Sequence, residues 1–229
     1  MKSLVFDTGP LISLSLNNIL DILEKLKPHY GGKFLITPSV KKEAVGNPLH
    51  SKKYKFEAIQ LLEQIKKGII DVYTYDGIKK DEKELLDLAN HIFKAHDNYI
   101  KIVHSGEIQA LAVTIKVNAD AFIVDEFVTR ALIENPKKVK RRLEKKLHTK
   151  VYINEKNLVK FKNKVKDVKV IRSVELIIVA YELGLLDEFK LLEDEPDKNL
   201  LDAVLWGCKL NGCSITRKEI FEIMKLEGF

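Results

Sequence analysis

Short β-prone runs alternate with helical patterns through the first 135 residues, and this alternation limits the possible folds more than any other feature. Apolar, strand-like runs occupy residues 3–6, 33–37, 69–75 and 121–124. Nearly continuous apolar strands are typical of parallel sheets that helices cover on both faces. The sequence therefore predicts an α/β fold, a doubly wound parallel sheet flanked by helices.

The first two predicted helices follow from apolar spacing and from proline. Residues 11–26 carry apolar side chains at helical spacing, which predicts one helix that stops before Pro28. Thr37 and Pro38 have the pattern of a cap followed by a first helical residue, so a second helix is expected to start there and end near Gly46.

Three further helices are expected before residue 120. Residues 80–96 form an amphipathic pattern, and residues 105–117 read as a nearly apolar helix capped by Ser105. Residues 56–68 predict a helix with one apolar stripe. That stripe consists of Phe56, Ile59, Leu62 and Ile65.

The charges are distributed unevenly along the chain. The formal net charge is +6, but 15 of the 39 Lys and Arg and only three of the 33 Asp and Glu lie within 137–172, which gives this segment +12 and the rest of the chain −6. Such an asymmetry favours contact with a polyanion, nucleic acid above all. The alternative is a solvated helical face.

The change of composition at Pro136 gives the expected domain organisation. We expect a single domain over 1–229 with a core at 1–135, a basic insertion at 136–169 that is an appendage to it, and a C-terminal strand and helices at 170–229. Residues 136–169 form the basic segment.

Several classes of protein are excluded or disfavoured by composition. No apolar run approaches the ~20 residues of a membrane span, and the N-terminus lacks the pattern of a signal peptide, so a cytoplasmic protein without membrane contact is expected. Cys208 and Cys213 have poor spacing for zinc and are expected to be buried free thiols.

Four acids stand where a parallel sheet would bring them together. Asp7 and Asp125 end predicted strands, Glu43 lies in the first turns of a helix, and Glu107 lies near the start of another. Ligands of open α/β sheets bind beyond the carboxyl ends of the strands. Four carboxylates there would repel one another unless a cation joined them, and oxygen ligands suit Mg²⁺ or Mn²⁺.

Each acid also has a local explanation. Asp7 could accept hydrogen bonds from the following turn, Glu107 could favour the positive end of its helix, and Glu43 could be solvated. Other enzyme classes fit less well: the residues after Asp7 hold no glycine pattern for a dinucleotide or P-loop, and Gly9 stands where an aspartyl phosphatase usually has a second aspartate.

In sequence order, four motifs resemble the PIN-domain family of metal-dependent nucleases: LVFDTGPLISL, ITPSVKKEA, SGEIQALAV and ADAFIVDEFVTRAL. The resemblance covers residues 1–135, and residues from 170 onward look like the C-terminal part of a prokaryotic subfamily that includes toxins of toxin–antitoxin pairs. It implies that Asp7, Glu43, Glu107 and Asp125 are the catalytic, metal-binding acids.

Two departures from the family pattern concern the acids. Glu107 stands where the family often has aspartate, and Glu126 follows Asp125 where aspartate or asparagine is common, so either residue of that pair is a candidate ligand. Thr8 and Arg130 are implied as supporting polar residues.

The resemblance implies an Mg²⁺- or Mn²⁺-dependent endoribonuclease, either a toxin with an antitoxin protein or an RNA-processing enzyme, and a homodimer is common in the family. The basic segment would bind the RNA. The alternative is a PIN-like module that binds RNA or protein without turnover. The expected RNA-binding residues are Lys137, Lys138, Lys140, Arg141, Arg142, Lys145 and Lys146.

Overall fold

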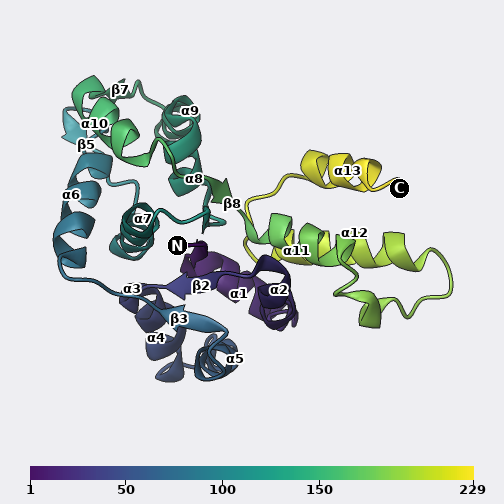
Figure 1. Ribbon diagram of the computed structural model, residues 1–229. Helices are drawn as coiled ribbons and strands as arrows, with labels where there is room; N and C mark the ends of the chain where they lie inside the picture. The colour runs from purple at the N-terminus through teal and green to yellow at the C-terminus, as the bar shows by residue number, and fades with distance from the viewer.

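A computed structural model describes residues 1–229 and contains a five-stranded parallel sheet flanked by helices (Figure 1). The α/β prediction is confirmed, including a strand in each of the four predicted runs. The order across the sheet is β3-β2-β1-β6-β8. The strands are β1 (Ser3–Phe6), β2 (Lys33–Ile36), β3 (Ile70–Val72), β6 (Ala121–Ile123) and β8 (Val170–Ile171).

The central strand β1 fixes the topology. All four of its residues are buried, and Val5 pairs with Leu35 of β2 on one side and Phe122 of β6 on the other. The chain fills the β2 side first and then returns to form β6 and β8 on the other side. The strand order therefore reverses between β1 and β6, where open α/β sheets bind ligands.

The single helix predicted before Pro28 is wrong, because the chain forms α1 (Thr8–Leu16) and α2 (Ile22–Tyr30). Between them Asn18 has a positive φ of 55°, and the side chain of Asn17 donates to the Ser13 carbonyl. These residues break the helix before the proline does. Pro28 lies inside the last turn of α2, where it removes one hydrogen-bond donor, and the helix ends two residues later at Tyr30.

The helix after Thr37 begins as predicted, with the Thr37 hydroxyl accepting from the Val40 N–H at 3.2 Å. It includes a π-helical turn and ends at Leu49, three residues past the predicted end near Gly46. The successive segments are α3 (Pro38–Lys41), η1 (Lys42–Gly46) and α4 (Asn47–Leu49).

The predicted helix at 56–68 forms as α5 (Lys55–Lys66), but only Leu62 and Ile65 of its predicted apolar stripe pack against the core. Phe56 is 67% exposed and Ile59 50% exposed, whereas Ala58 and Leu61 are buried. The helix has apolar residues on two sides, and packing against α1 and η1 selects the side with the smaller Ala58.

The next two helices differ from prediction at their ends. The helix predicted over 80–96 is α6 (Ile78–Asn90), and the residues after it form strand β4 (Phe93–Ala95). The helix at 105–117 is α7 (Ser105–Val117), but its N-cap is His104 rather than Ser105. The Ser105 hydroxyl donates instead to Glu82 on α6, so a tertiary contact replaces the local cap.

The basic segment folds against the middle of the chain. It forms α9 (Pro136–Leu147), β7 (Tyr152–Ile153) and α10 (Glu155–Val165), after α8 (Phe127–Glu134). Strand β7 pairs with β4, which also pairs with β5 (Asn98–Tyr99), and the three make a second, antiparallel sheet. Helix α10 packs on α6.

One hydrophobic cluster of 55 buried residues joins the parallel sheet and the basic segment, and it includes Val139, Val151 and Phe161. Among the helices, none combines the length and apolar character that crossing a membrane would require.

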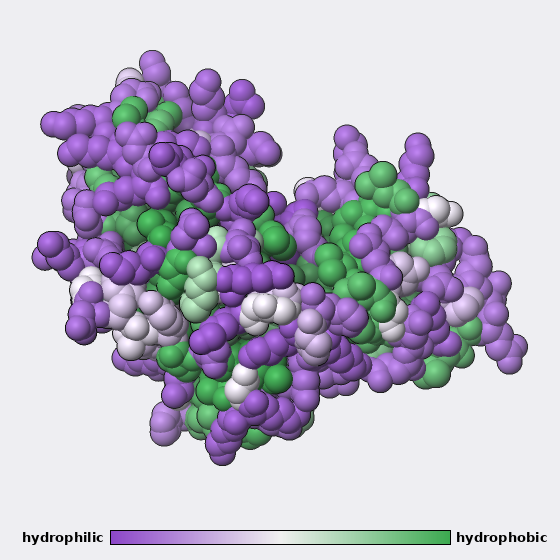
Figure 2. Space-filling view, in the orientation of Figure 1, coloured by the Kyte–Doolittle hydropathy of each residue, from purple (hydrophilic) through white to green (hydrophobic).

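The chain ends in helices that extend away from the sheet (Figure 1). Figure 2 shows hydrophobic residues exposed on this C-terminal arm, whereas the outer end of the basic segment is mostly hydrophilic. Cys208 and Cys213 are buried free thiols, as predicted. The arm contains α11 (Ser173–Glu182), η2 (Asp187–Phe189), α12 (Pro196–Leu210) and α13 (Arg217–Leu226).

A cavity-forming substitution in the basic segment should destabilise the whole protein. Phe161 of α10 is fully buried, so Phe161→Ala should lower the free energy of unfolding by about 3 kcal/mol in one cooperative transition. Urea unfolding followed by circular dichroism measures this change. Val159 on the same helix is 56% exposed, and Val159→Ala should change stability by less than about 0.5 kcal/mol. A separate early transition confined to Phe161→Ala would contradict a shared core.

Candidate metal centre

A cavity of ≈400 Å³ opens at the carboxyl ends of β1 and β6, where the strand order reverses. All four acids predicted as metal ligands line it, together with Glu126. No Lys or Arg side chain lines this cavity. The lining residues are Asp7, Thr8, Gly9, Ile12, Glu43, His104, Gly106, Glu107, Asp125, Glu126, Asn211 and Gly212.

Strands and helices from four separate parts of the chain position the acids. Asp7 follows β1 and is the N-cap of α1, and Glu43 lies in the π-helical turn η1. Glu107 lies in the first turn of α7. Asp125 follows β6, and Glu126 is the N-cap of α8, where its side chain accepts from the Thr129 N–H at 2.7 Å. The acids converge because parallel strands and the helices that follow them meet at one edge of the sheet.

Asp7 is the most perturbed of these acids. Burial, together with the negative charges of Glu107 and Glu43, raises its pKa to about 7, although the N–H groups of Thr8 and Gly9 lower it. Glu107 and Glu43 therefore both lie within electrostatic reach of Asp7. A nearby cation would remove this repulsion.

Glu107 is held by a neighbouring hydroxyl. Burial raises its pKa, as does the charge of Glu126, while the Thr129 hydroxyl donates to the Glu107 carboxylate at 2.7 Å and lowers it. Thr129 thus binds Glu126 through its backbone N–H and Glu107 through its side chain. One residue fixes two of the acids.

Asp125 is held by Ser173, at the start of α11. Its two carboxylate oxygens accept hydrogen bonds from the Ser173 N–H and the Ser173 hydroxyl, both at 2.7 Å. Burial raises its pKa, and these bonds lower it. The carboxylate therefore has a fixed orientation, with part of its hydrogen-bonding capacity already used.

A glycine makes room for one acid. A Cβ atom at Gly106, beside Glu107, would lie 2.9 Å from Glu43 Oε2. The absence of a side chain there lets the Glu43 carboxylate approach the start of α7.

The two residues predicted to support the site are placed differently. The Thr8 hydroxyl is buried at the cavity without a hydrogen-bond partner. Arg130 does not line the cavity, and its guanidinium donates to the Ser214 carbonyl at 3.2 Å.

Sequence reasoning missed the residues that reach the site from the C-terminal arm. Asn211 and Gly212 line the cavity from the loop after α12, and Ser173 holds Asp125. The only sign of these residues in the sequence was Gly212, in the short loop that joins the last two helices. His104, the N-cap of α7, also lines the cavity.

The residues predicted to bind RNA lie on α9, outside the cavity. Most are exposed, while Lys140 is half-buried and lies 3.8 Å from Glu144. Arg142 lies over the ring of Phe127, 4.7 Å from its centroid. Phe127 directly follows Glu126, so this contact brings α9 next to an acid of the cavity.

The donor set fits a hard divalent cation in chemistry and charge: five carboxylates, an unpartnered hydroxyl and no Lys or Arg line one cavity. In this conformation, however, no three His, Cys, Asp or Glu side chains form a group close enough to hold a metal ion.

No protein-family model, curated protein or solved structure matches this chain. The resemblance to PIN-domain nucleases therefore remains a prediction from the four motifs.

Neutralising Asp7 should stabilise the protein when a chelator is present. Because the pKa of Asp7 is raised on folding, ionising it costs more free energy in the folded protein than in the unfolded chain. The protein therefore loses stability as the pH rises from 3.8, the ordinary pKa of aspartate, to about 7. Asp7→Asn removes this cost, so its melting temperature at pH 8 should exceed that of the native protein by at least about 3 °C.

The difference should be smaller at pH 5, where the folded protein keeps Asp7 protonated. Differential scanning fluorimetry at both pH values measures it, with Asp194→Asn at an exposed loop as the control. Added Mg²⁺ should raise the melting temperature of the native protein more than that of Asp7→Asn. A lower melting temperature for Asp7→Asn at pH 8 would contradict the repulsion among these acids.

Proposed function

We propose that this protein is a PIN-like, metal-dependent endoribonuclease that hydrolyses phosphodiester bonds in RNA. One observation carries the proposal: five carboxylates and no Lys or Arg line a cavity at the point where the strand order reverses. The order of the acids along the chain also agrees with the four motifs of the PIN family.

In this proposal Asp7, Glu43, Glu107 and Asp125 hold Mg²⁺ or Mn²⁺. When bound, such an ion lowers the pKa of water and offsets the negative charge that develops on the phosphate. The burial of Asp7 beside Glu107 and Glu43 supports this assignment, because a cation would relieve their repulsion.

The residues around the acids would keep them in place. Thr129 binds Glu107 and Glu126, and Ser173 binds Asp125, so the carboxylates have fixed directions before a ligand arrives. Such supporting hydrogen bonds orient metal ligands in many proteins. The Thr8 hydroxyl, buried and without a partner, is free to donate to a phosphate oxygen.

The basic segment would hold the RNA backbone. Its lysines and arginines would contact phosphates, and Arg142 connects α9 to the cavity through Phe127. In this proposal the acidic cavity binds the metal ion, and the basic surface beside it binds the RNA.

A second candidate is an RNA-binding module without turnover. It is favoured by the absence of a preformed group of three metal-binding side chains and by the hydrogen bonds that Ser173 makes to both oxygens of Asp125.

A cleavage assay separates the two candidates. The native protein should cleave mixed single-stranded RNA with Mg²⁺ or Mn²⁺ and should be inactive with EDTA. Asp7→Asn and Glu107→Gln should each lower the cleavage rate by at least about 100-fold, because they remove proposed ligands, and Ser173→Ala should lower it about 10- to 100-fold. Asp194→Asn should cleave at the native rate. Equal activity of the native protein and Asp7→Asn would refute the nuclease proposal.

Replacing basic residues of α9 should weaken RNA binding and its salt dependence. In a variant with Gln at Lys137, Lys138, Arg141 and Arg142, the slope of log K against log salt between about 50 and 200 mM should become shallower by ~0.7 for each phosphate that the protein no longer neutralises. Fluorescence anisotropy in EDTA measures both. Replacing Lys79, Lys80 and Lys83 of α6 with Gln controls for the general loss of positive charge. A slope unchanged from that of the native protein would show that α9 does not contact the backbone.

A further inference from the structure

The small antiparallel sheet carries a row of three side chains on its outer face. Lys94 of β4 pairs with Tyr99 of β5 on one side and with Tyr152 of β7 on the other. Directly paired residues of antiparallel strands point to the same face of a sheet. Phe93 and Ala95, the neighbours of Lys94, are buried, so the row occupies the opposite face.

Both tyrosines are presented to solvent with cationic or polar neighbours. Tyr99 is 45% exposed and Tyr152 57% exposed. Lys150 Nζ lies 5.1 Å from the centre of the Tyr152 ring, and the His91 ring meets Tyr99 edge-on with centroids 4.7 Å apart. The Asn154 side-chain amide donates to the Tyr99 hydroxyl at 3.2 Å, which restrains that ring.

We propose that this row is a stacking platform for unpaired bases of single-stranded RNA, a proposal that rests on the proposed function. Exposed aromatic rings beside cations bind single strands by stacking on bases and contacting phosphates. Tyr99 and Tyr152 are two strand spacings apart, about 10 Å, so each ring takes its own base, with Lys94 between them. The exposed ion pair from Lys94 to Asp97, 3.0 Å long, is weak enough to exchange for a phosphate.

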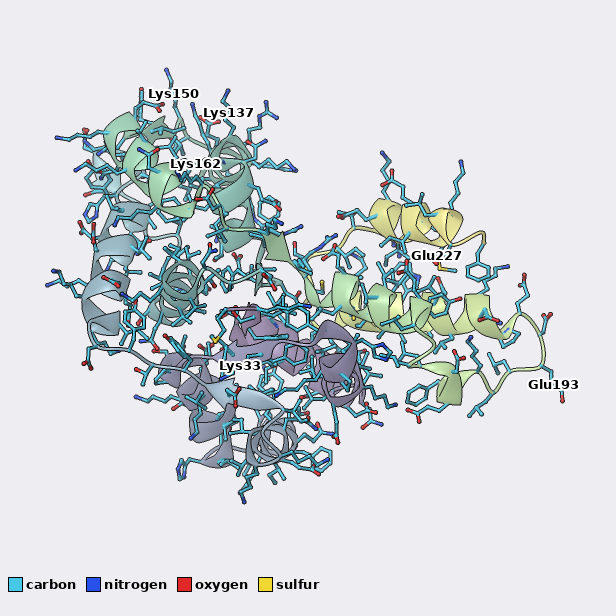
Figure 3. All side chains as sticks on the ribbon, in the orientation of Figure 1. Lys33, Lys137, Lys150, Lys162, Glu193 and Glu227 are labelled. Carbon is cyan, nitrogen blue, oxygen red and sulfur yellow. The ribbon has the colours of Figure 1, made fainter.

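RNA fits the row better than a protein partner does. An apolar protein surface would bury the Lys94 ammonium in the middle of the row, which costs free energy, whereas a nucleic acid pairs it with phosphate. The surrounding segment also has a strong excess of positive charge, and Figure 3 shows Lys137 and Lys150 at its outer end.

The platform is joined to the cavity by a short, fixed connection. Four residues lie between Tyr99 and His104, which lines the cavity, so their Cα atoms are at most ~18 Å apart. Asn90, at the end of α6, holds this connection in place. Its side chain accepts hydrogen bonds from the N–H groups of Ile102 and Val103 and donates one to the Val103 carbonyl. A strand stacked on the platform is therefore held within reach of the acids.

Anisotropy with a short labelled single-stranded RNA in EDTA tests the platform, because binding is then read without cleavage. Tyr99→Ala and Tyr152→Ala should each weaken binding about 5- to 150-fold, the range for losing one stacked base. Tyr99→Phe and Tyr152→Phe should bind within about threefold of the native protein, since the ring is kept. Phe221→Ala, at a residue 66% exposed on α13, is the control for loss of an exposed ring and should bind as the native protein does.

Two further titrations distinguish stacking from general charge. Duplex RNA offers no unpaired bases, so the alanine variants should bind it with native affinity; equal losses for duplex and single strand would overturn the platform. Native single-strand affinity of both alanine variants would also overturn it, as would displacement of the RNA by polyglutamate at equal charge concentration, which would indicate a surface that binds any polyanion. The nuclease proposal fails separately, if Asp7→Asn cleaves RNA as the native protein does.

Discussion

The burial of neighbouring carboxylates at the carboxyl edge between β1 and β6 is the constraint on which the site depends. Burial first, and then the charges of Glu107 and Glu43, raise the pKa of Asp7, and no Lys or Arg lines the cavity to neutralise these acids. A fold keeps such an arrangement only at a cost in stability, because burying like charges without a partner is unfavourable. A divalent cation would offset that cost, which is the physical basis of the proposed metal-dependent function.

Hydrogen bonds from two arginines hold the part of the C-terminal arm that reaches this site. Arg172, buried at the start of α11, donates to the Ser214 carbonyl and to the carboxylates of Glu175 and Glu219, while Arg130 donates to the same carbonyl. Together these bonds hold the loop after α12, and with it Asn211, at the rim of the cavity. Arg130 thus supports the site from a distance, by fixing a loop rather than by facing the acids.

The basic segment shows how strong charge and a shared core can coexist. Val139 and Phe161 belong to the same buried cluster as the parallel sheet, while lysines and arginines occupy the solvent side of α9. Strand β7 binds the segment to β4 and creates the row of Tyr99, Lys94 and Tyr152. A strongly basic surface is thereby attached rigidly to the body that carries the acids.

The sequence by itself determined the elements that local chemistry dictates. The apolar runs of β1, β2, β3 and β6, the Thr37 cap and the acids at strand ends were all readable, because burial on both faces and capping leave local patterns. Only the tertiary structure decided which face of α5 is buried, that Ser105 bonds Glu82 instead of capping α7, that β7 pairs with β4, and that Ser173 and Asn211 reach the acids. Those outcomes depend on contacts between residues far apart in the chain, whose energies outweigh local preference and leave no pattern in a single sequence.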